Sequence, residues 1–288
     1  MAKGVRKLKI EVYASVIKDV GLKRTEDLLE LLVQRGEEVW LDCETDREFK
    51  GVIRGNAPSP EILIVLGGDG TIMRAARRGA VIGVPILGID LGRLGYLAEL
   101  SPDDKDGLMS VLDGDYHIEK RSLLETSVVK NGVETDEAMI AINDVVVSHG
   151  KASHLLEVEI LCDASSLGRY RADGFIVSTP TGSTAYSLAA GGPVISPRLN
   201  GMCLTPICPH SLTARPIIVP DDSLIEIRYL SPSNSSSSLT IDGIESDILF
   251  CGDSLKIRKS NLTADFIRVS RKREMSFYEV LRTKMSDL

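Results

Sequence analysis

The amino-acid sequence predicts an N-terminal α/β domain with a parallel sheet, followed by a mainly β C-terminal domain. Strand-like and helix-like segments alternate as far as Gly114, which is typical of a parallel sheet covered by helices. Beyond Gly114, short alternating segments separated by turn residues predict antiparallel strands. The 288 residues, of which 43% are hydrophobic and 26% charged, suffice for one large or two ordinary globular domains.

The first domain is expected to have the order β-α-β-β-α-β. Hydrophobic patterning predicts strands at residues 9–12, 39–41, 62–66 and 84–89, and helices at residues 20–35, 71–78 and 101–112. The first helix should end at Gly36, and the third should begin at the cap formed by Ser101 and the acids that follow it. Residues 42–60 are polar and contain proline, so a connecting loop is expected there.

The second domain is expected to be built from short strands and hairpins. Strands are predicted at residues 118–129, 138–147, 154–161, 174–178, 224–229, 239–241 and 253–257. The serine-rich residues 231–238 predict a flexible hairpin tip or a disordered loop, and residues 274–284 predict a short helix. The predicted domains are therefore residues 1–115 and 116–265, with a C-terminal segment at 266–288.

Composition excludes several classes of protein. No run of about 18 apolar residues exists, so no membrane-spanning segment is expected. The net charge of −7 provides no electrostatic footprint for nucleic acid. Five scattered cysteines argue against a disulfide framework, and a cytoplasmic location is expected. The spacing of Cys203, Cys208 and His210 fits no zinc pattern, so no residue is assigned to a metal.

The turn after the strand at residues 62–66 is the first candidate site. Gly67, Gly68, Gly70 and Thr71 would bring backbone N–H groups to the end of the sheet, where phosphate groups are commonly bound. A carboxylate normally repels phosphate, so Asp69 suggests metal binding or proton acceptance from a hydroxyl. A plain turn, with Asp69 as a helix cap, remains an alternative.

A second glycine-containing turn follows the next predicted strand, at residues 90–95. Gly92 and Gly95 permit close approach of the backbone to a ligand, and Arg93 could supply a cation. A purely structural turn is equally consistent with this stretch.

Two short polar stretches of the β domain suggest ligand contacts. Asn143 and Asp144 begin an apolar strand and could hold the two hydroxyls of a ribose; a strand-entry turn is the alternative. Arg171 and Asp173 precede the strand at residues 174–178 and offer donors and acceptors, although a surface ion pair would look the same.

A third stretch, residues 178–193, combines hydroxyl, small and turn residues. Six serine and threonine residues fall within residues 178–187, and Gly191, Gly192 and Pro193 close the stretch. Residues 184–190 are expected to form a helix whose start exposes N–H and hydroxyl donors. Small residues would let a flat ring approach the backbone, and Tyr186 could stack or donate a hydrogen bond.

Together these stretches closely resemble the NAD kinases, and the likeness covers nearly the whole chain from Ile62 onward. It rests on Gly67-Gly-Asp-Gly-Thr71, Asn143-Asp144, residues 173–193, residues 204–216 and the closing residues 276–284. The Gly-Gly-Asp-Gly motif alone is weak, because lipid kinases and phosphofructokinases share it. The long Thr/Ser/Gly stretch is specific.

The resemblance implies a C-terminal helix packed on the first domain, an active site between the domains, and a homodimer or homotetramer. The implied reaction transfers a phosphoryl group from ATP or another donor to the 2′-hydroxyl of the adenosine ribose of NAD, with Mg²⁺ neutralising the donor phosphates. Asp69 would be the proton acceptor. The other implied NAD contacts are Gly70, Arg74, Asn143, Asp144, His154, Arg171, Asp173, Thr184, Ala185, Tyr186, Ser187, Leu188 and Ala189.

Three positions depart from the family pattern. Asp144 stands where many members carry Glu, Asp90 where Asn is usual, and Ile244 where Gln is common, so no ligand contact is assigned to Ile244. Two other functions compete with the implied one. A lipid or sugar kinase would share Gly-Gly-Asp-Gly but would not explain residues 181–193. A non-catalytic NAD sensor would not need Asp69 and the glycines, all of which are present.

Overall fold

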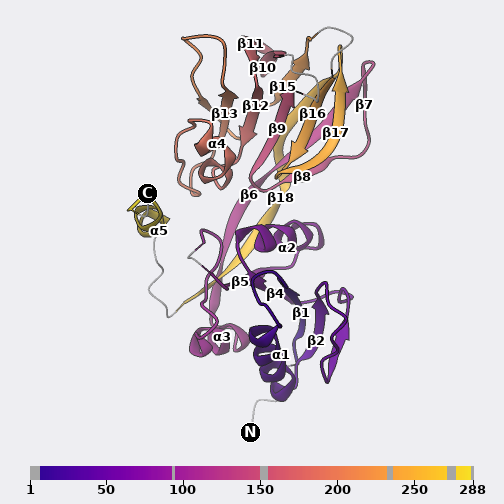
Figure 1. The fold of residues 1–288 in the computed structure, drawn as a ribbon, viewed down its shortest axis with the longest axis vertical. Coiled ribbons are helices and arrows are strands. Elements are labelled where there is room, and N and C mark those ends of the chain that lie inside the picture. The colour runs from indigo at the N-terminus through magenta and orange to yellow at the C-terminus, as the bar shows by residue number, and fades with distance from the viewer. Residues whose placement is uncertain (1–6, 93–94, 150–154, 232–235, 271–276, 287–288) are drawn as a thin grey trace. The chain divides into compact units, whose positions relative to one another are not determined.

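The computed structural model describes residues 7–92, 95–149, 155–231, 236–270 and 277–286. The chain divides into two compact units (Figure 1). Unit 1 comprises Met1–Lys120 and Ala264–Leu288, and unit 2 comprises Arg121–Thr263. An α/β part with a mostly parallel sheet, an antiparallel β part and a C-terminal helix are present, which confirms the predicted fold class.

Unit 1 contains a parallel sheet in the order β5-β4-β1-β2-β3. Its strands are β1 (Lys9–Ala14), β2 (Glu38–Asp42), β3 (Val52–Arg54), β4 (Ile62–Gly67) and β5 (Ile86–Asp90). At the β5 edge, Phe266 of the long strand β18 (Ser254–Val269) pairs in parallel with Ile86. The prediction that residues 42–60 are only a loop was wrong, since β3 lies within them.

Helices cover both faces of this sheet. α2 (Asp69–Ile82) lies on one face, and α1 (Lys23–Arg35) and α3 (Lys105–Leu112) lie on the other (Figure 1). Every residue of β4 is buried, which explains its uninterrupted apolar run. The helix starts differ from the prediction: α2 begins at Asp69, and the cap of α3 is Asp104, whose side chain accepts the Gly107 amide.

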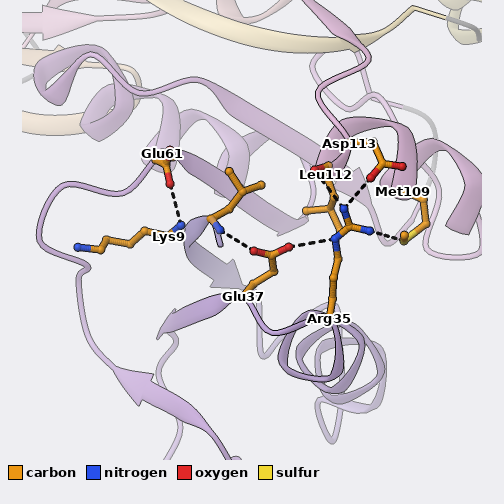
Figure 2. A network of polar contacts seen from close by, with 8 residues as sticks. Lys9, Arg35, Glu37, Glu61, Met109, Leu112 and Asp113 are labelled. Carbon is orange, nitrogen blue, oxygen red and sulfur yellow. Dashed lines mark hydrogen bonds and ion pairs between the residues drawn. The ribbon is translucent and has the colours of Figure 1, made fainter. Parts of the chain in front are cut away.

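A polar network joins the end of α1 to the end of α3 (Figure 2). The Arg35 guanidinium binds Glu37 at 3.0 Å and Asp113 at 2.6 Å. Glu37 also accepts the backbone amide of Leu8 at 2.6 Å, and its side chain is only 1% exposed. A buried carboxylate needs such partners, because desolvation otherwise disfavours its charge.

Replacing Arg35 with Met should lower the free energy of unfolding by about 3 kcal/mol, because the buried Glu37 carboxylate loses its ion pair. Denaturation in urea measures this loss. The control Arg24→Met breaks a pair with Asp103 whose side chains are 47% and 76% exposed. That variant should change stability by less than about 1 kcal/mol. Equal losses of unfolding free energy in the two variants would contradict a stabilising ion pair between Arg35 and the buried Glu37.

Unit 2 is a pair of antiparallel sheets that share one core. One sheet has the order β14-β13-β12-β9-β16-β17, and the other contains β11-β10-β15-β18 with β6 paired to β18. Inward side chains such as Val145, Phe175, Leu204 and Ile227 form a continuous apolar cluster between them. The strands are β6 (Tyr116–Lys130), β7 (Val133–Glu134), β8 (Met139–Ala141), β9 (Asp144–His149), β10 (Leu156–Cys162), β11 (Ser165–Ala172), β12 (Gly174–Ser178), β13 (Met202–Ile207), β14 (Ile217–Val219), β15 (Ile225–Tyr229), β16 (Ser236–Ile241) and β17 (Ile244–Phe250).

Three features of unit 2 correct the predictions. The strand expected at residues 138–147 is two strands, β8 and β9, separated by a bend at Asn143. The serine-rich stretch is not all loop, because Ser236–Ser238 belong to β16. Strands β7, β11, β13, β14 and β17 were not predicted.

The C-terminal helix α5 spans Phe277–Ser286 and therefore begins later than residue 274. Its Phe277 ring lies 5.8 Å from the ring of Tyr96, a residue of unit 1. Among the described residues, no helix is both long enough and apolar enough to cross a bilayer.

Candidate active site

The Gly-Gly-Asp-Gly turn joins the carboxyl end of β4 to the start of α2. Gly68 is the N-cap of α2, and no side chain caps the helix. The first amides of an α-helix lack the usual intrahelical acceptor, and here the Thr71 amide donates to the Gly68 carbonyl at 2.9 Å. The positive end of the helix dipole lies at this edge of the sheet, where it favours an anion. Asp69 is the first helical residue and does not act as the cap, which excludes the helix-cap alternative. Nothing lies within 4 Å of a Cβ built on Gly70, which leaves open space beside the turn.

The Asp69 carboxylate faces the turn that follows β5. It accepts the amides of Tyr96 at 3.2 Å and Leu97 at 3.4 Å, and its side chain remains 34% exposed. A Cβ on Gly95 would lie 2.1 Å from Asp69 Oδ1, so a glycine is required where this carboxylate rests. Asp69 is thus held in place by long, weak bonds while part of it stays accessible.

Asp90 shapes the same turn from the end of β5. Its two carboxylate oxygens accept the amides of Gly92 at 2.9 Å and Gly95 at 3.0 Å, and the residue is 8% exposed. Asp90 therefore stabilises the turn against which the Asp69 carboxylate rests. Arg93, which the sequence suggested as a cation here, lies outside the described residues.

The basic side chains of unit 1 include Arg74 and Lys284. Arg74 is exposed on α2, with its guanidinium 5.8 Å from the ring centroid of Tyr13. Lys284 Nζ of α5 lies 4.0 Å from Asp69 Oδ2 and 4.5 Å from the centroid of the Tyr96 ring. Burial, and then the charge of Asp69, raise the pKa of Tyr96.

Asn143 and Asp144 lie where β8 passes into β9 in unit 2. Asp242, in the turn between β16 and β17, accepts the amides of Ile142, Asn143 and Asp144 at 2.9, 2.7 and 3.1 Å. Asn143 is half-buried, whereas Asp144 is only 4% exposed. Asp242 was not predicted as a site residue, although its Asp-Gly pair had marked the turn.

Burial, and then the charge of Asp242, raise the pKa of Asp144 to about 7. The unfolded chain would ionise this group near its ordinary value of 3.8. The native protonated form therefore contributes stability that is fully present below pH 3.8 and is lost as the pH rises through about 7.

The Asp144→Asn variant should consequently gain stability over the parent protein as the pH rises from 4 to about 7, and keep that gain at higher pH. Asn cannot ionise, so it avoids a buried charge beside Asp242. Thermal unfolding at pH 5 and pH 8 measures the change. Asp136→Asn, at an exposed position, is the control and should show no such dependence. A gain in stability that is identical at both pH values would contradict the raised pKa of Asp144.

The hydroxyl-rich stretch folds against the Asn143 backbone. The Thr179 hydroxyl donates to the Ile142 carbonyl at 2.6 Å, and the Thr179 amide donates to the Asn143 carbonyl at 2.8 Å. A Cβ on Gly182 would lie 2.0 Å from that Asn143 oxygen. The structure therefore brings two stretches that are distant in sequence into direct contact.

The helix expected at residues 184–190 is instead a 3-10 turn, Gly182–Thr184, followed by the short helix α4, Tyr186–Ala189. Several hydroxyls bind the protein itself: Ser183 donates to the Pro180 carbonyl at 2.6 Å, and Ser187 lies 2.9 Å from the Thr205 hydroxyl. Tyr186, Leu188 and Ala189 are exposed, while Thr184 and Ala185 are half-buried. Solvent therefore reaches mainly these side chains of the stretch.

Arg171 and Asp173 lie at the opposite end of β12 from Thr179. Asp173 precedes Gly174, the first residue of β12, and its carbonyl accepts the His149 amide at 3.1 Å. The five residues of β12 separate the two ends by about 13 Å. Within this chain, Arg171 and Asp173 therefore do not lie beside Asn143. His154 lies outside the described residues.

The described residues contain no group of three or more His, Cys, Asp or Glu side chains that could hold a metal ion by themselves. Magnesium commonly takes only one or two carboxylates and is otherwise bound by substrate phosphates and water. The partly exposed Asp69 carboxylate fits that pattern, whereas Asp90 is occupied by two amides.

Comparison with known proteins covers both units. A sequence model described as the ATP-NAD kinase N-terminal domain matches residues 16–116, and one described as the ATP-NAD kinase C-terminal domain matches residues 142–269. The NAD kinase of Heliobacterium modesticaldum is 42% identical over 240 residues, which cover 80% of this chain and 83% of that protein. The NAD kinase of Geobacter sp. strain M21 is 36% identical over 285 residues, covering 96% and 98%.

Solved structures give the same result. An NAD kinase from Archaeoglobus fulgidus in complex with ATP has a TM-score of 0.69 at 27% identity, covering 96% of this chain and 98% of that one. Yeast NADH kinase complexed with NADH shares the fold, with a TM-score of 0.82 at 24% identity, covering 98% and 88%.

Proposed function

The chain belongs to the NAD kinase family, and from this premise we propose how its own residues carry out phosphoryl transfer to NAD. The enzyme makes NADP by moving a phosphoryl group from ATP, or another donor, to the 2′-hydroxyl of the adenosine ribose. Such reactions depend mainly on positioning the reactants and neutralising charge. The residue roles below follow from that requirement.

Asp69 orients the ribose hydroxyl and accepts its proton. The observation that carries this role is a carboxylate 34% exposed at the carboxyl end of the sheet, beside a helix N-terminus that no side chain caps. A carboxylate is a weak base for an alcohol, so in a loose transition state the proton leaves late. Orientation and late proton acceptance are then two parts of one role.

The backbone of Gly67, Gly68, Gly70 and Thr71 holds the donor phosphates. The start of α2 is not capped by a side chain, and its positive dipole favours an anion there. Mg²⁺ bound to the donor would neutralise phosphate charge, and Asp69 is the described residue of this turn that can reach it. Arg74 adds a cation on the same helix.

Unit 2 holds the dinucleotide. Half-buried Asn143 can both donate and accept hydrogen bonds at the adenosine ribose, and the buried Asp144 follows it in the chain. The exposed residues of the segment from Thr184 to Ala189 would run along the dinucleotide, with Tyr186 available for stacking. Arg171, Asp173 and His154 remain proposed NAD contacts on the strength of the family pattern.

The competing functions are less well supported. A lipid or sugar kinase that shared only Gly-Gly-Asp-Gly would not account for the C-terminal domain match at residues 142–269. A non-catalytic sensor would not need an accessible Asp69 beside an uncapped helix.

The assembly is proposed to be a homodimer or homotetramer. β17 ends one sheet of unit 2, and it carries Ile244, Ile248 and Phe250, which are 57%, 44% and 55% exposed. An exposed apolar row on an edge strand favours contact with another chain. A cytoplasmic location is also proposed, since all five cysteines are free thiols.

The test is a direct assay of the product. Purified protein with Mg²⁺, NAD and ATP should form NADP, measured with an NADP-specific dehydrogenase; reactions without NAD or without donor are the controls. Failure to form NADP with ATP, other nucleoside triphosphates and polyphosphate would reject the proposal. Offering sugars and lipids as acceptors then tests the competing kinase function.

A further inference from the structure

The carboxyl ends of β1 and β4 lie at a point where the connections of the sheet diverge. β1 leads through α1 to β2, whereas β4 leads through α2 to β5, and the two helices lie on opposite faces (Figure 1). Ligands of open parallel sheets bind in the crevice at such a switch point. The two loops involved are neighbours, because the Ser15 amide donates to the Leu66 carbonyl at 3.0 Å.

Lys18 belongs to the loop after β1, and its side chain extends to the turns that follow β4 and β5. Its ammonium nitrogen lies 2.3 Å from the position that a Cβ on Gly68 would take, and 3.3 Å from the corresponding position on Gly92. Lys18 thus lies against the backbone of both glycine turns. The absence of side chains at Gly68 and Gly92 makes this close approach possible.

The loop that carries Lys18 is anchored. Asp19 is 5% exposed and accepts the amides of Arg24 at 3.2 Å and Thr25 at 2.7 Å, which ties the loop to the start of α1. The Asp19 amide in turn donates to the Ser15 carbonyl at 2.9 Å. The backbone position of Lys18 is therefore well defined even though its side chain is exposed.

Lys18 forms no ion pair within the described part of the chain. Other lysines do: Lys130 binds Asp247, Lys256 binds Glu134, and Lys259 binds Asp221. An ammonium that forms no ion pair, in a protein of net charge −7, is available to bind an anion beside the two glycine turns.

We propose that Lys18 binds the phosphates of the phosphoryl donor at the Gly67–Thr71 turn. This proposal rests on the function proposed above and extends it by a residue outside the glycine motif. The ammonium would supply a charge-assisted hydrogen bond from one side, while the amides at the start of α2 bind from the other. The Asp69 carboxylate rests against Gly95, whereas the Lys18 ammonium lies against Gly68 and Gly92.

The experiment compares Lys18→Met, Lys18→Arg and Lys23→Met with the parent protein. Lys23 is an exposed lysine at the start of α1 and serves as the matched control. Lys18→Met should raise the KM for ATP at least about tenfold, as expected for loss of one charge-assisted bond, and leave the KM for NAD unchanged. Lys18→Arg should restore most of the loss. Because the contact is to phosphate, GTP and inorganic tripolyphosphate should be affected as much as ATP.

Titration calorimetry with ATP and with tripolyphosphate, in the absence of NAD, provides a second readout that does not depend on turnover. Lys18→Met should weaken both, and Lys23→Met neither. The proposal is overturned if Lys18→Met and Lys23→Met bind ATP equally, if only the KM for NAD rises, or if the parent protein binds neither phosphate compound. Absence of NADP formation by a parent protein that still binds ATP through Lys18 would reject the kinase function alone.

Discussion

The Asp69→Asn variant should bind NAD as the parent protein does but turn over at least about a hundredfold more slowly, because it loses the group that orients the ribose hydroxyl and accepts its proton. Asn keeps one side-chain oxygen that can accept an amide of the Tyr96–Leu97 backbone, so the turn should persist. Steady-state turnover and titration calorimetry with NAD measure the two quantities separately.

Asp90→Asn is the matched control for this variant. It makes the same chemical change at the turn that Asp69 faces, at a carboxylate that binds the Gly92 and Gly95 amides and is 8% exposed. Losing one of these bonds should reduce turnover by less than about tenfold. If Asp69→Asn reduces turnover no more than Asp90→Asn does, Asp69 is not the proton acceptor.

The Gly182→Ala variant should lose NAD affinity and stability together. The added Cβ would lie 2.0, 2.5 and 2.7 Å from the carbonyl oxygen, the carbonyl carbon and the Cα of Asn143, all of them backbone atoms that cannot rotate away. Asn143 must therefore shift. We expect the KM for NAD to rise at least about tenfold and the free energy of unfolding to fall by about 1–3 kcal/mol.

Gly201→Ala is the control for this second variant, since it adds the same methyl group in unit 2. There the nearest atoms are the Val219 carbonyl oxygen at 3.2 Å and Ile218 Cγ2 at 3.3 Å, so a small relaxation suffices. Kinetics with varied NAD and unfolding in urea should leave Gly201→Ala close to the parent protein. Equal KM values for the two variants would show that the turn at Gly182 does not position Asn143.

The parallel sheet was predictable because burial on both faces leaves a simple signal. Leu63, Ile64 and Val65 are fully buried, and the short uninterrupted run of apolar residues that contains them indicates a strand. β3 and β11 gave no such signal, since β3 has three residues with little burial and β11 is mostly polar. The first half of β16, Ser236–Ser238, was missed for another reason: its alternation uses serine, and Ser237 is 1% exposed although it is polar.

The candidate site was predictable where one stretch of sequence contains it, as at Gly67–Thr71. Contacts between residues that lie far apart in the sequence were not predictable. Asp242 lies about a hundred residues from the amides it accepts, and Lys18 lies in a loop that carries no recognisable local motif. The hydroxyl stretch was recognised as ordered, but folding turns Ser183 and Ser187 inward to hold the loop, which no local pattern reveals.

The two ends of β18 pair with different neighbours: Ile225–Arg228 of β15 pair with its first residues, and β5 pairs with Phe266 near its last. During synthesis, β1 to β5 leave the ribosome long before Ala264–Val269 exist. Until then the start of β5, at Ile86, is an open sheet edge, able to recruit a strand from another chain. The order of translation therefore makes unit 1, although it begins first, complete only after unit 2 has been synthesised.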